Sequence, residues 1–319
     1  MASYIARRLL WTLLLLLVIT AVTFLIFYVI PSADPAAQRA GRDPSPALID
    51  AIRHQLGLDK SLPAQYWNYT KKLFFHFDFG QSFINNTSVK SLIFDRLPNT
   101  IFLVIGAAII WFVTGVGLGL FTAVRAGRWS DRLVTVLALV GISMPVFWLG
   151  IVSRYYLAEG GLVTWFPDGE YVGLTDNPLE WLSHLILPWI VLAVLFIGFY
   201  GRVLRGNILD TINEDYVRTA KAKGLSQRRI MVKHVLRTSL IPVVTLFGLD
   251  FAAVLGGGAI LTETVFDLHG VGQYAAQSID NFDLPPIMGV TMYGAFFIVA
   301  FSMLVDLFYA YLDPRIRPT

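Results

Sequence analysis

Between Leu9 and Ile30 the chain reads LLWTLLLLLVITAVTFLIFYVI, a run of 22 residues with no charged side chain. Hydrocarbon about 30 Å thick is crossed by roughly 20 apolar residues of helix, so this run is long enough to span a membrane. A cleavable signal peptide is the alternative, because the small residues Ser32-Ala-Asp-Pro-Ala36 follow. The apolar core of a signal peptide has only roughly 7–15 residues, which favours a retained anchor.

The composition extends this interpretation to the whole chain. Of its 319 residues, 55% are hydrophobic and 15% are charged. In soluble domains about a quarter of the residues are charged. The mean hydropathy is +0.62. Pro145 and Pro188 are expected to kink or to start helices. The sequence predicts an all-α polytopic membrane protein with six transmembrane helices, at residues 9–30, 98–124, 133–157, 185–204, 239–262 and 285–312.

The short loops differ in charge. Cations precede the first span, separate the second span from the third and the fourth from the fifth, and close the chain, whereas the connections 158–184 and 263–284 contain no Lys or Arg. Cytoplasmic loops carry the excess of Lys and Arg. We therefore expect both termini in the cytoplasm and these two connections outside it.

The connection 31–97 is an exception, because it holds eight cations against six Asp. It is too long for the short-loop rule to apply, so we place it outside as a small segment. The predicted organisation is a cytoplasmic end with the first span at 1–30, an extracytoplasmic segment at 31–97, a five-helix core at 98–312 that includes a cytoplasmic hairpin at 202–238, and a cytoplasmic tail at 313–319.

The hairpin 202–238 carries nine cationic side chains between two spans, which indicates a segment that contacts another protein. Its first helix is expected to be capped by Asn213 and stopped by Gly224 in the left-handed conformation. Ser226 is expected to cap a second helix that runs to Arg237. Four charged residues suit the dipole of the first helix, with acids at its start and bases at its end: Glu214, Asp215, Lys221 and Lys223.

Three formally charged residues are predicted inside the spans, where such residues are functional candidates. Arg154 lies near the outer end of the third span and either snorkels to the headgroups or lines a path. Asp306 lies near the cytoplasmic end of the last span and is expected to pair or to face an interfacial pocket. Asp250 lies in the middle of the fifth span, so it must face a partner or a water-filled path, or be protonated.

Small residues recur at helical spacing in the second and fifth spans. In the second span, Gly115 and Gly119 are four residues apart. In the fifth span, Gly256 and Gly257 each lie four residues after an alanine, Ala252 and Ala253. Glycine in a helix costs up to about 1 kcal/mol relative to alanine, and close helix approach is its usual compensation in lipid. Helix packing and a hinge both remain open as interpretations.

Three classes of function fit a polytopic protein. A channel-forming subunit would be moved by an external motor through the hairpin. A secondary transporter usually has inverted repeats and coupling carboxylates or broken helices near the midplane, whereas this chain has one central Asp and no convincing repeat. An intramembrane enzyme would need clustered catalytic groups in the spans. The sequence has no Gly-x-x-x-x-Gly-Lys-Ser/Thr phosphate loop and no cysteine, so P-loop ATP hydrolysis and thiolate chemistry are excluded.

The hairpin sequence Glu214-Asp-Tyr-Val-Arg-Thr-Ala-Lys-Ala-Lys-Gly224-Leu resembles the coupling loop of bacterial ABC-importer permeases. Arg218-Thr219-Ala220 stand at the positions of the Glu-Ala-Ala pattern general to that superfamily, so that the glutamate and the first alanine are replaced. These departures are typical of its dipeptide, oligopeptide and nickel branch. Further blocks similar to that branch are Ala6-Arg-Arg-Leu-Leu10, Asp78-Phe-Gly-Gln-Ser82, Leu97-Pro-Asn-Thr100, Thr262-Glu-Thr-Val-Phe266, Gly270-Val-Gly272 and Leu312-Asp-Pro-Arg315.

The resemblance implies a type I importer permease in the bacterial plasma membrane. It implies a homologous second permease, one or two ATPase subunits that bind ATP and Mg²⁺, and an extracytoplasmic substrate-binding protein as partners. Beyond these proteins we expect contact with lipid and none with nucleic acid, and no cofactor, metal or catalytic residue in this chain. Peptides are the expected cargo, with nickel chelates or oligosaccharides as the alternative. The ATPase contact would consist of Asp215, Tyr216, Arg218, Thr219, Ala220, Lys221, Lys223, Gly224 and Leu225, and the path candidates are Asp250 and Arg154.

Overall fold

The computed structural model describes residues 2–29, 35–40 and 45–312. Within these ranges the chain forms helices joined by loops, and pairing of β type is limited to two isolated bridges, Gln81 with Ser88 and Ala158 with Phe166. The chain forms two compact units. Unit 1 contains the residues up to Pro98, Leu255–Ile260 and the chain from Gly270 onward; unit 2 contains Asn99–Val254 and Leu261–His269.

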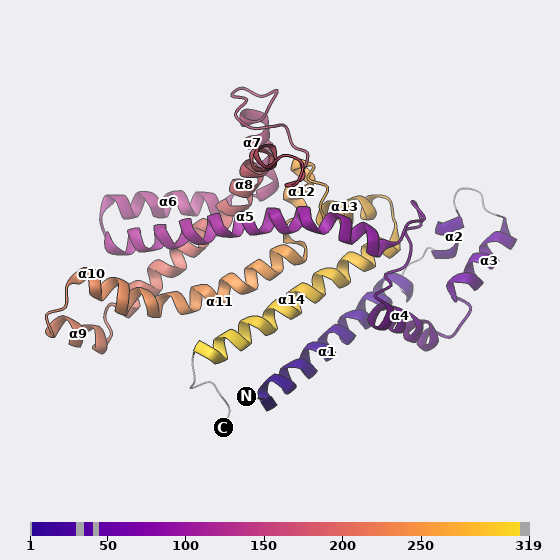
Figure 1. Cartoon of the computed structure of the whole chain (residues 1–319), viewed down its shortest axis with the longest axis horizontal. Coiled ribbons are helices and arrows are strands. Elements are labelled where there is room, and N and C mark those ends of the chain that lie inside the picture. The colour runs from indigo at the N-terminus through magenta and orange to yellow at the C-terminus, as the bar shows by residue number, and fades with distance from the viewer. Residues whose placement is uncertain (1, 30–34, 41–44, 313–319) are drawn as a thin grey trace. The chain divides into compact units, whose positions relative to one another are not determined.

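Unit 1 is organised around the first and last long helices, α1 and α14, which pack against each other (Figure 1). Its helices are α1 Ala2–Phe24 with a π-helical extension Leu25–Val29, α2 Pro35–Ala40, α3 Pro46–Leu56, α4 Leu62–His76, the start of α5 Val89–Val124, α13 Val271–Asp280 and α14 Leu284–Leu312. A buried apolar cluster joins α5, α13 and α14 through residues such as Val89, Tyr274 and Val290.

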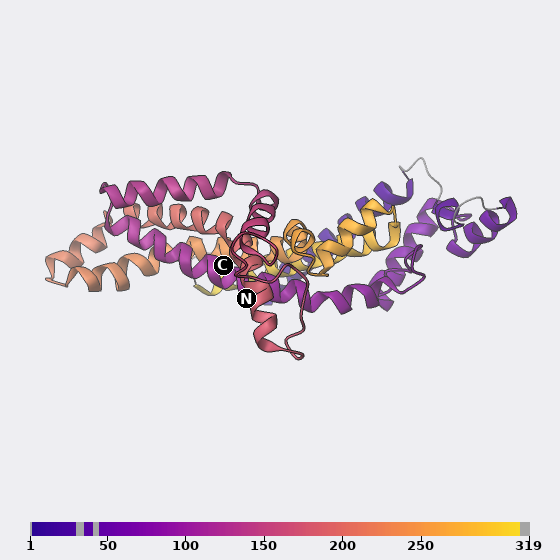
Figure 2. The ribbon, with the colours of Figure 1, turned by 90° about the horizontal axis from the view of Figure 1, so that it is seen from above.

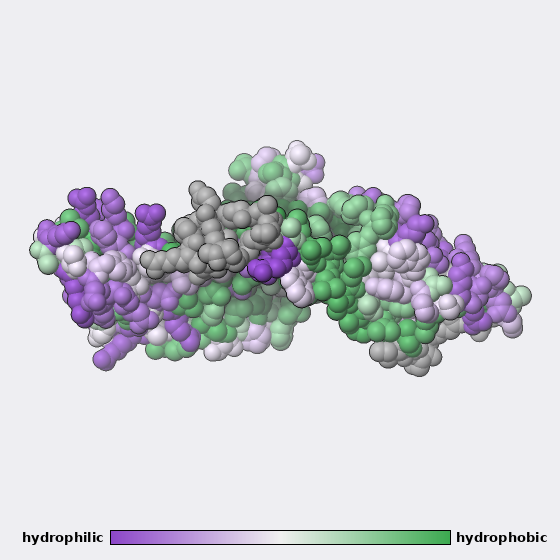
Figure 3. Space-filling view, turned by 90° about the horizontal axis from the view of Figure 1, so that it is seen from below, coloured by the Kyte–Doolittle hydropathy of each residue, from purple (hydrophilic) through white to green (hydrophobic). Residues whose placement is uncertain are grey.

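Unit 2 is a bundle in which α5, α6, α8 and α11 lie side by side (Figures 1 and 2). Its helices are the rest of α5, α6 Trp129–Ser143, α7 Val146–Leu157, α8 Pro178–Thr211, α9 Asp215–Ala222, α10 Gln227–Arg229, a π-helical segment Ile230–Leu236, α11 Arg237–Ala253 and α12 Ile260–Phe266. Hydrophilic residues gather over the end of this unit that holds α9 and α10, and apolar residues cover much of the rest (Figure 3).

The predicted number of spans is confirmed. Among the described residues five helices are long and apolar enough to cross a membrane, and a sixth span is formed if α6 and α7 count as one. Those two helices are bent by 100° at the break. The expectation that Pro145 kinks or starts a helix is confirmed, because Pro145 takes an extended conformation as the N-cap of α7 and interrupts the predicted span 133–157.

Several predicted helix ends also differ from the structure. α5 begins at Val89 and not near residue 98, because Pro98 is tolerated inside it. α8 continues to Thr211, well beyond the expected end of the fourth span. The fifth span starts at Gln227 and ends at Gly258, so the second hairpin helix does not end at Arg237 but continues into the membrane span. These helices extend past their apolar parts because polar residues outside the membrane continue the same backbone hydrogen bonding. The predicted tail at 313–319 lies outside the described residues.

The glycines serve close packing at some positions and a bend at another. A Cβ on Gly115 would lie 2.7 Å from Tyr200 Cβ, and one on Gly119 would lie 2.8 Å from Leu204 Cβ, so both glycines let α5 approach α8. Gly257 has a φ of 147° in the π-helical segment Val254–Gly258, where the helix is kinked. Packing thus explains the second-span pair, and a backbone bend explains Gly257.

Candidate coupling helix and translocation-path residues

The short helix α9 forms where the hairpin motif predicts it. Its N-cap is Glu214, which has extended backbone angles, and not Asn213 as the sequence suggested. The Asn213 amide instead donates to the carbonyl of Leu209 at 3.0 Å, so this residue completes the end of α8. Asp215 occupies the first turn of α9 and Lys221 its last turn, as the helix dipole favours.

The C-terminus of α9 is a Schellman motif, which fixes the direction of the chain after the helix. Gly224 has a φ of 75°, its N–H donates to the Lys221 carbonyl at 3.0 Å, and the N–H of Leu225 donates to the Ala220 carbonyl at 3.3 Å. The predicted left-handed stop is confirmed. Ser226 then caps α10 by accepting from the N–H of Arg229 at 3.4 Å, as predicted.

The two faces of α9 differ in chemistry. Val217 is fully buried and Ala220 is 7% exposed, whereas the opposite face is exposed and mostly charged, with Asp215, Arg218, Thr219, Lys221 and Lys223. The Arg218 guanidinium lies 3.3 Å from Asp215, and both side chains are so exposed that this pair adds little stability. The charged face is therefore available for a partner, while the apolar face fixes α9 to the rest of unit 2.

Polar contacts join α9 and α8 to the beginning of α11. The Tyr216 hydroxyl lies 3.3 Å from Oγ1 of Thr238. The Asn207 amide donates to the Ser239 carbonyl, and the Ser239 hydroxyl donates to the Asn207 carbonyl, both at 3.2 Å. Because these bonds are reciprocal, the ends of α8 and α11 next to α9 are held in one arrangement. A displacement of α9 is expected to reach both helices.

Asp250 has a partner within the same chain. The hydroxyl of Tyr200, on α8, donates to Oδ2 of Asp250, on α11, at 2.7 Å. Tyr200 is 1% exposed, and Asp250 is half-buried. In the same unit, the ring of Trp111 contacts the rings of Phe196 and Phe247. This is one of the three environments that the sequence left open for Asp250; its role in a path stays a prediction.

Arg154 lies at the end of α7 and holds a loop. Its Nε donates to Oδ1 of Asp168 and its Nη1 to the Val265 carbonyl, both at 2.6 Å. The hydrogen bond from the Arg154 guanidinium lowers the pKa of the Asp168 carboxyl below its ordinary value. An open cleft of about 590 Å³ beside the pair is lined by Ile151, Arg154, Tyr155, Glu159, Gly160, Gly161, Asp168 and Val265. The contacts show Arg154 tying the connection 158–177 to α12; contact with a substrate stays a prediction.

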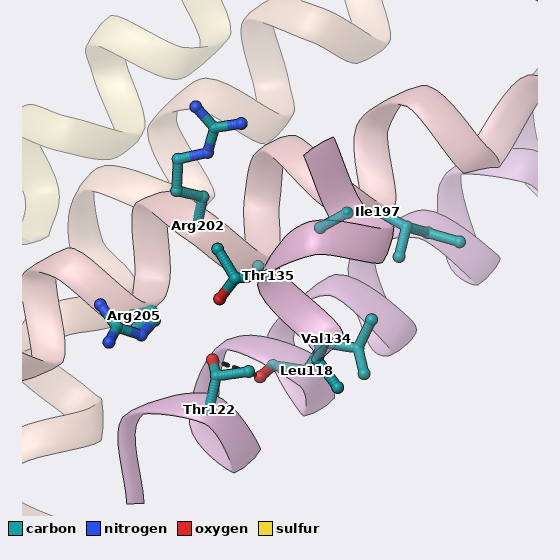
Figure 4. Close-up of a pocket in the computed structure, with 9 residues that line it drawn as sticks. Leu118, Thr122, Val134, Thr135, Ile197, Arg202 and Arg205 are labelled. Carbon is teal, nitrogen blue, oxygen red and sulfur yellow. Dashed lines mark hydrogen bonds between the residues drawn. The ribbon is translucent and has the colours of Figure 1, made fainter. Parts of the chain in front are cut away.

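One partly buried ion pair, between α8 and α6, has no signal in the sequence. The Arg205 guanidinium binds the Asp131 carboxylate through two hydrogen bonds, from Nε to Oδ1 at 2.9 Å and from Nη2 to Oδ2 at 2.8 Å. Arg205 appears in the sequence only as one cation among nine in the hairpin, and Asp131 as one acid between two arginines. Since the partners are 74 residues apart, no local pattern signals the pair. Figure 4 shows Arg205 beside the small cavity that it lines with residues of α5, α6 and α8.

Comparison with known families matches nearly the whole chain. Residues 115–318 match the family described as binding-protein-dependent transport system inner membrane component. Residues 1–104 match the model for the N-terminal part of the membrane component of such systems. The second match covers α1 to α4 and the first part of α5, so the additional first span and the following segment belong to the same family pattern.

Relatives align over almost their entire length. A permease named for peptide transport in Brucella abortus (strain 2308) is 37% identical over 317 residues, which are 99% of both chains. A dipeptide transport system permease of Alkalihalophilus pseudofirmus is 36% identical over 99% of this chain and 100% of its own. A glutathione transport system permease of Salmonella typhimurium is 35% identical over 99% of both chains. This chain belongs to the inner-membrane permeases of binding-protein-dependent ABC importers, in their peptide branch.

Proposed function

We propose that this protein is a pore-forming permease subunit of an ATP-driven importer of di- or oligopeptides, with α9 as its coupling helix. One observation carries the proposal. α9 buries Val217 and Ala220 against its own unit while it presents a charged, exposed face outward. A helix that is anchored on one face and free on the other suits a surface contact with an ATPase subunit.

The coupling follows from the contacts around α9. Closure of two ATPase subunits would displace α9, and the bonds between Asn207 and Ser239 would pass this displacement to α8 and α11 together. Those two helices carry Tyr200 and Asp250. The central polar pair of unit 2 therefore lies on the helices that α9 moves.

The partners of the complex have separate tasks. ATP and Mg²⁺ would be bound by the ATPase subunits, and a binding protein would deliver the cargo on the outer side. A second permease would complete the pore, and the complex would lie in the inner membrane of a bacterium with both termini of this chain in the cytoplasm. The charge distribution of the short loops supports that orientation.

Peptides are favoured as cargo because the relatives aligned over full length are named for transport of peptides, dipeptides and glutathione. Asp250 fits such a path. A peptide needs polar groups that solvate its backbone and its ends, and the half-buried carboxylate of Asp250, bonded to the Tyr200 hydroxyl, offers one such group.

The test is uptake by the reconstituted complex. Proteoliposomes with both permeases and the ATPases would be supplied with the cognate binding protein and with labelled dipeptides, labelled pentapeptides or a nickel chelate. We expect ATP-dependent accumulation of at least one peptide class. Accumulation of the nickel chelate alone, or of no cargo in the presence of ATP, would contradict the proposed function.

A further inference from the structure

Asp131 of α6 is a buried acidic side chain with several hydrogen-bond donors. Its side chain is 4% exposed, and its oxygens accept from two nitrogens of Arg205 and from the N–H of Gly127 at 2.9 Å. Gly127 lies in the turn between α5 and α6, and Asp131 lies in the first turn of α6. A single carboxylate thus holds this turn, the start of α6 and α8 together.

Arg205 lies on α8 near the residues that bond α11. Arg205 lies just before Asn207 and Thr211, the two α8 residues that bond Ser239 of α11. Ser239 follows directly on Thr238, which the Tyr216 hydroxyl of α9 contacts. Polar contacts between helices, together with short steps along the backbones of α11 and α8, therefore link α9 to α6.

α6 and α8 pack closely at Gly198, whose Cβ would lie 2.6 Å from the Ala138 carbonyl oxygen, but a cavity interrupts this packing near the Asp131 pair. A cavity of about 60 Å³ lies between α5, α6 and α8, with Arg205 in its wall together with Thr122 and Thr135 (Figure 4). This volume has room for a few water molecules. Beside this space, the two hydrogen bonds between Arg205 and Asp131 form a directional contact between α8 and α6.

We propose that Asp131 and Arg205 form a clamp that makes α6 and the turn between α5 and α6 move together with the coupling helix. The two are positioning residues, and the proposal rests on the proposed function of α9. Arginine suits the task because its planar guanidinium binds both carboxylate oxygens in one fixed orientation, whereas lysine offers a single point of contact. Without the clamp, movement of α9 would still reach α8 and α11 but would be lost before α6.

The chain offers a matched control on the same helix. Arg202 lies one turn before Arg205 and lines the same cavity, but it is exposed and takes no part in the Asp131 pair. Figure 4 shows the two guanidinium groups pointing away from each other. Comparing Arg205→Gln with Arg202→Gln therefore separates loss of the clamp from loss of one positive charge on α8.

The experiment measures whether the two cytoplasmic elements move as one body. The chain has no cysteine, so spin labels can be placed at Arg128 in the turn and at Ala222 on α9, which is outside the predicted ATPase contact; both are exposed. Double electron–electron resonance on the full complex, with and without ATP and Mg²⁺, gives the distance distribution. We expect the same distribution in both states for the wild type and for Arg202→Gln. For Arg205→Gln we expect it to broaden and to shift when ATP binds.

The ratio of ATP hydrolysed to peptide taken up distinguishes loss of the clamp from a simple loss of stability. In assembled complexes, Arg205→Gln is expected to raise severalfold the ATP hydrolysed per peptide taken up. Arg205→Lys should have an intermediate effect and Arg202→Gln none. If Arg205→Gln instead keeps the wild-type ratio and distances, the clamp is refuted. Asp131→Asn keeps an acceptor for the N–H of Gly127 and removes the charge, so it should match Arg205→Gln; wild-type behaviour would also refute the clamp.

The two proposals can fail separately. If the wild-type complex takes up no peptide, the proposed function fails whatever the variants do. If the wild type takes up peptide and Arg205→Gln behaves like Arg202→Gln, only the clamp fails.

Discussion

The hydroxyl of Tyr200 donates to the carboxylate of Asp250 at 2.7 Å, and this bond joins α8 to α11 in unit 2. Tyr200 reaches this position because Gly115 of α5 has no side chain, since a Cβ there would lie 2.7 Å from Tyr200 Cβ. The absence of a side chain at Gly115 on α5 thus lets Tyr200 on α8 bind the carboxylate of Asp250 on α11. The relationship ties the glycine pattern of α5 to the one central acidic residue that the sequence singled out.

Tyr200→Phe tests the bond itself. It removes the donor and leaves the carboxylate of Asp250 without the hydroxyl, which should lower the free energy of unfolding by about 1–3 kcal/mol. The measurement is the thermal transition of the purified permease pair. Tyr156→Phe, at an exposed tyrosine of α7, is the control and should change little. Equal transitions for the two variants would show that the Tyr200 bond contributes nothing.

Asp250→Asn separates a transport role from a structural one. Asparagine keeps an acceptor for the Tyr200 hydroxyl, so we expect the complex to assemble with little loss of stability. If Asp250 lines the path, uptake or preference among peptides should change severalfold in the same assay that tests the proposed function. Wild-type uptake of every peptide by an assembled Asp250→Asn complex would remove Asp250 from the path.

Gly115→Ala tests the close approach of α5 and α8. The new methyl group would press on Tyr200 Cβ, so the helices must separate, and overpacking of this kind typically costs about 1–3 kcal/mol. Gly117→Ala is the control, because within the described part of the chain no atom outside its own turn of α5 lies within 4 Å of the position of its Cβ. Thermal unfolding should show a loss for the first variant and no loss or a small gain for the second. Similar losses at both positions would point to a general effect of alanine and not to packing.

Much of this architecture follows from local signals. Uninterrupted apolar runs identified the spans, and Gly224 and Ser226 identified the end of α9 and the start of α10, because caps and left-handed stops depend on neighbouring residues only. The cap at Asn213 was wrong for the same reason. Its amide can bond either helix end, and the continuation of α8 to Thr211 decides in favour of Leu209.

Contacts between residues far apart in the chain could not be predicted from the sequence. The pairs Asp131 with Arg205 and Tyr200 with Asp250 depend on which faces of α6, α8 and α11 meet. Two motif blocks also meet in unit 2, where the Thr100 hydroxyl donates to the buried Glu263 carboxylate at 2.7 Å. The family resemblance identified these blocks as shared features, but only the fold gives the physical reason for them. For Asp306 the sequence predicted either an ion pair or an interfacial pocket. The structure shows the ion pair, and its partner, Arg8, was not predicted.

The ion pair of Arg154 and Asp168 gives a prediction on pH. Because the hydrogen bond from Arg154 lowers the folded-state pKa of Asp168 below the ordinary value of 3.8, the pair is intact above that value and is lost only as the pH falls through the lowered pKa. Hydrogen exchange in residues 158–177, corrected for intrinsic rates, should therefore be as protected at pH 5 as at pH 7. Asp168→Asn should lose protection at both pH values. Loss of protection in the wild type between pH 7 and 5 would contradict this assignment.

The orientation in the membrane can be tested on the cysteine-free chain. Single cysteines at Ser61, Asp176 and Lys223 would be exposed in the structure. We expect an impermeant thiol reagent to label the first two from outside intact cells and the third only after permeabilisation. Labelling of the Lys223→Cys protein in intact cells would overturn the predicted topology and with it the cytoplasmic position of α9.

The central claim is that α9 couples ATP hydrolysis to transport, and the most direct test is the number of ATP molecules hydrolysed per peptide taken up by Gly224→Val. A β-branched residue at a φ of 75° costs about 1–3 kcal/mol and disturbs the turn after α9. Apart from its chain neighbours, no atom of the described residues lies within 4 Å of the Gly224 Cβ position, so a clash there does not complicate the test. Gly206→Val, on α8 with equal space, is the control. We predict an assembled complex in which Gly224→Val hydrolyses ATP with little uptake while Gly206→Val keeps the wild-type ratio; a wild-type ratio for Gly224→Val would contradict the claim.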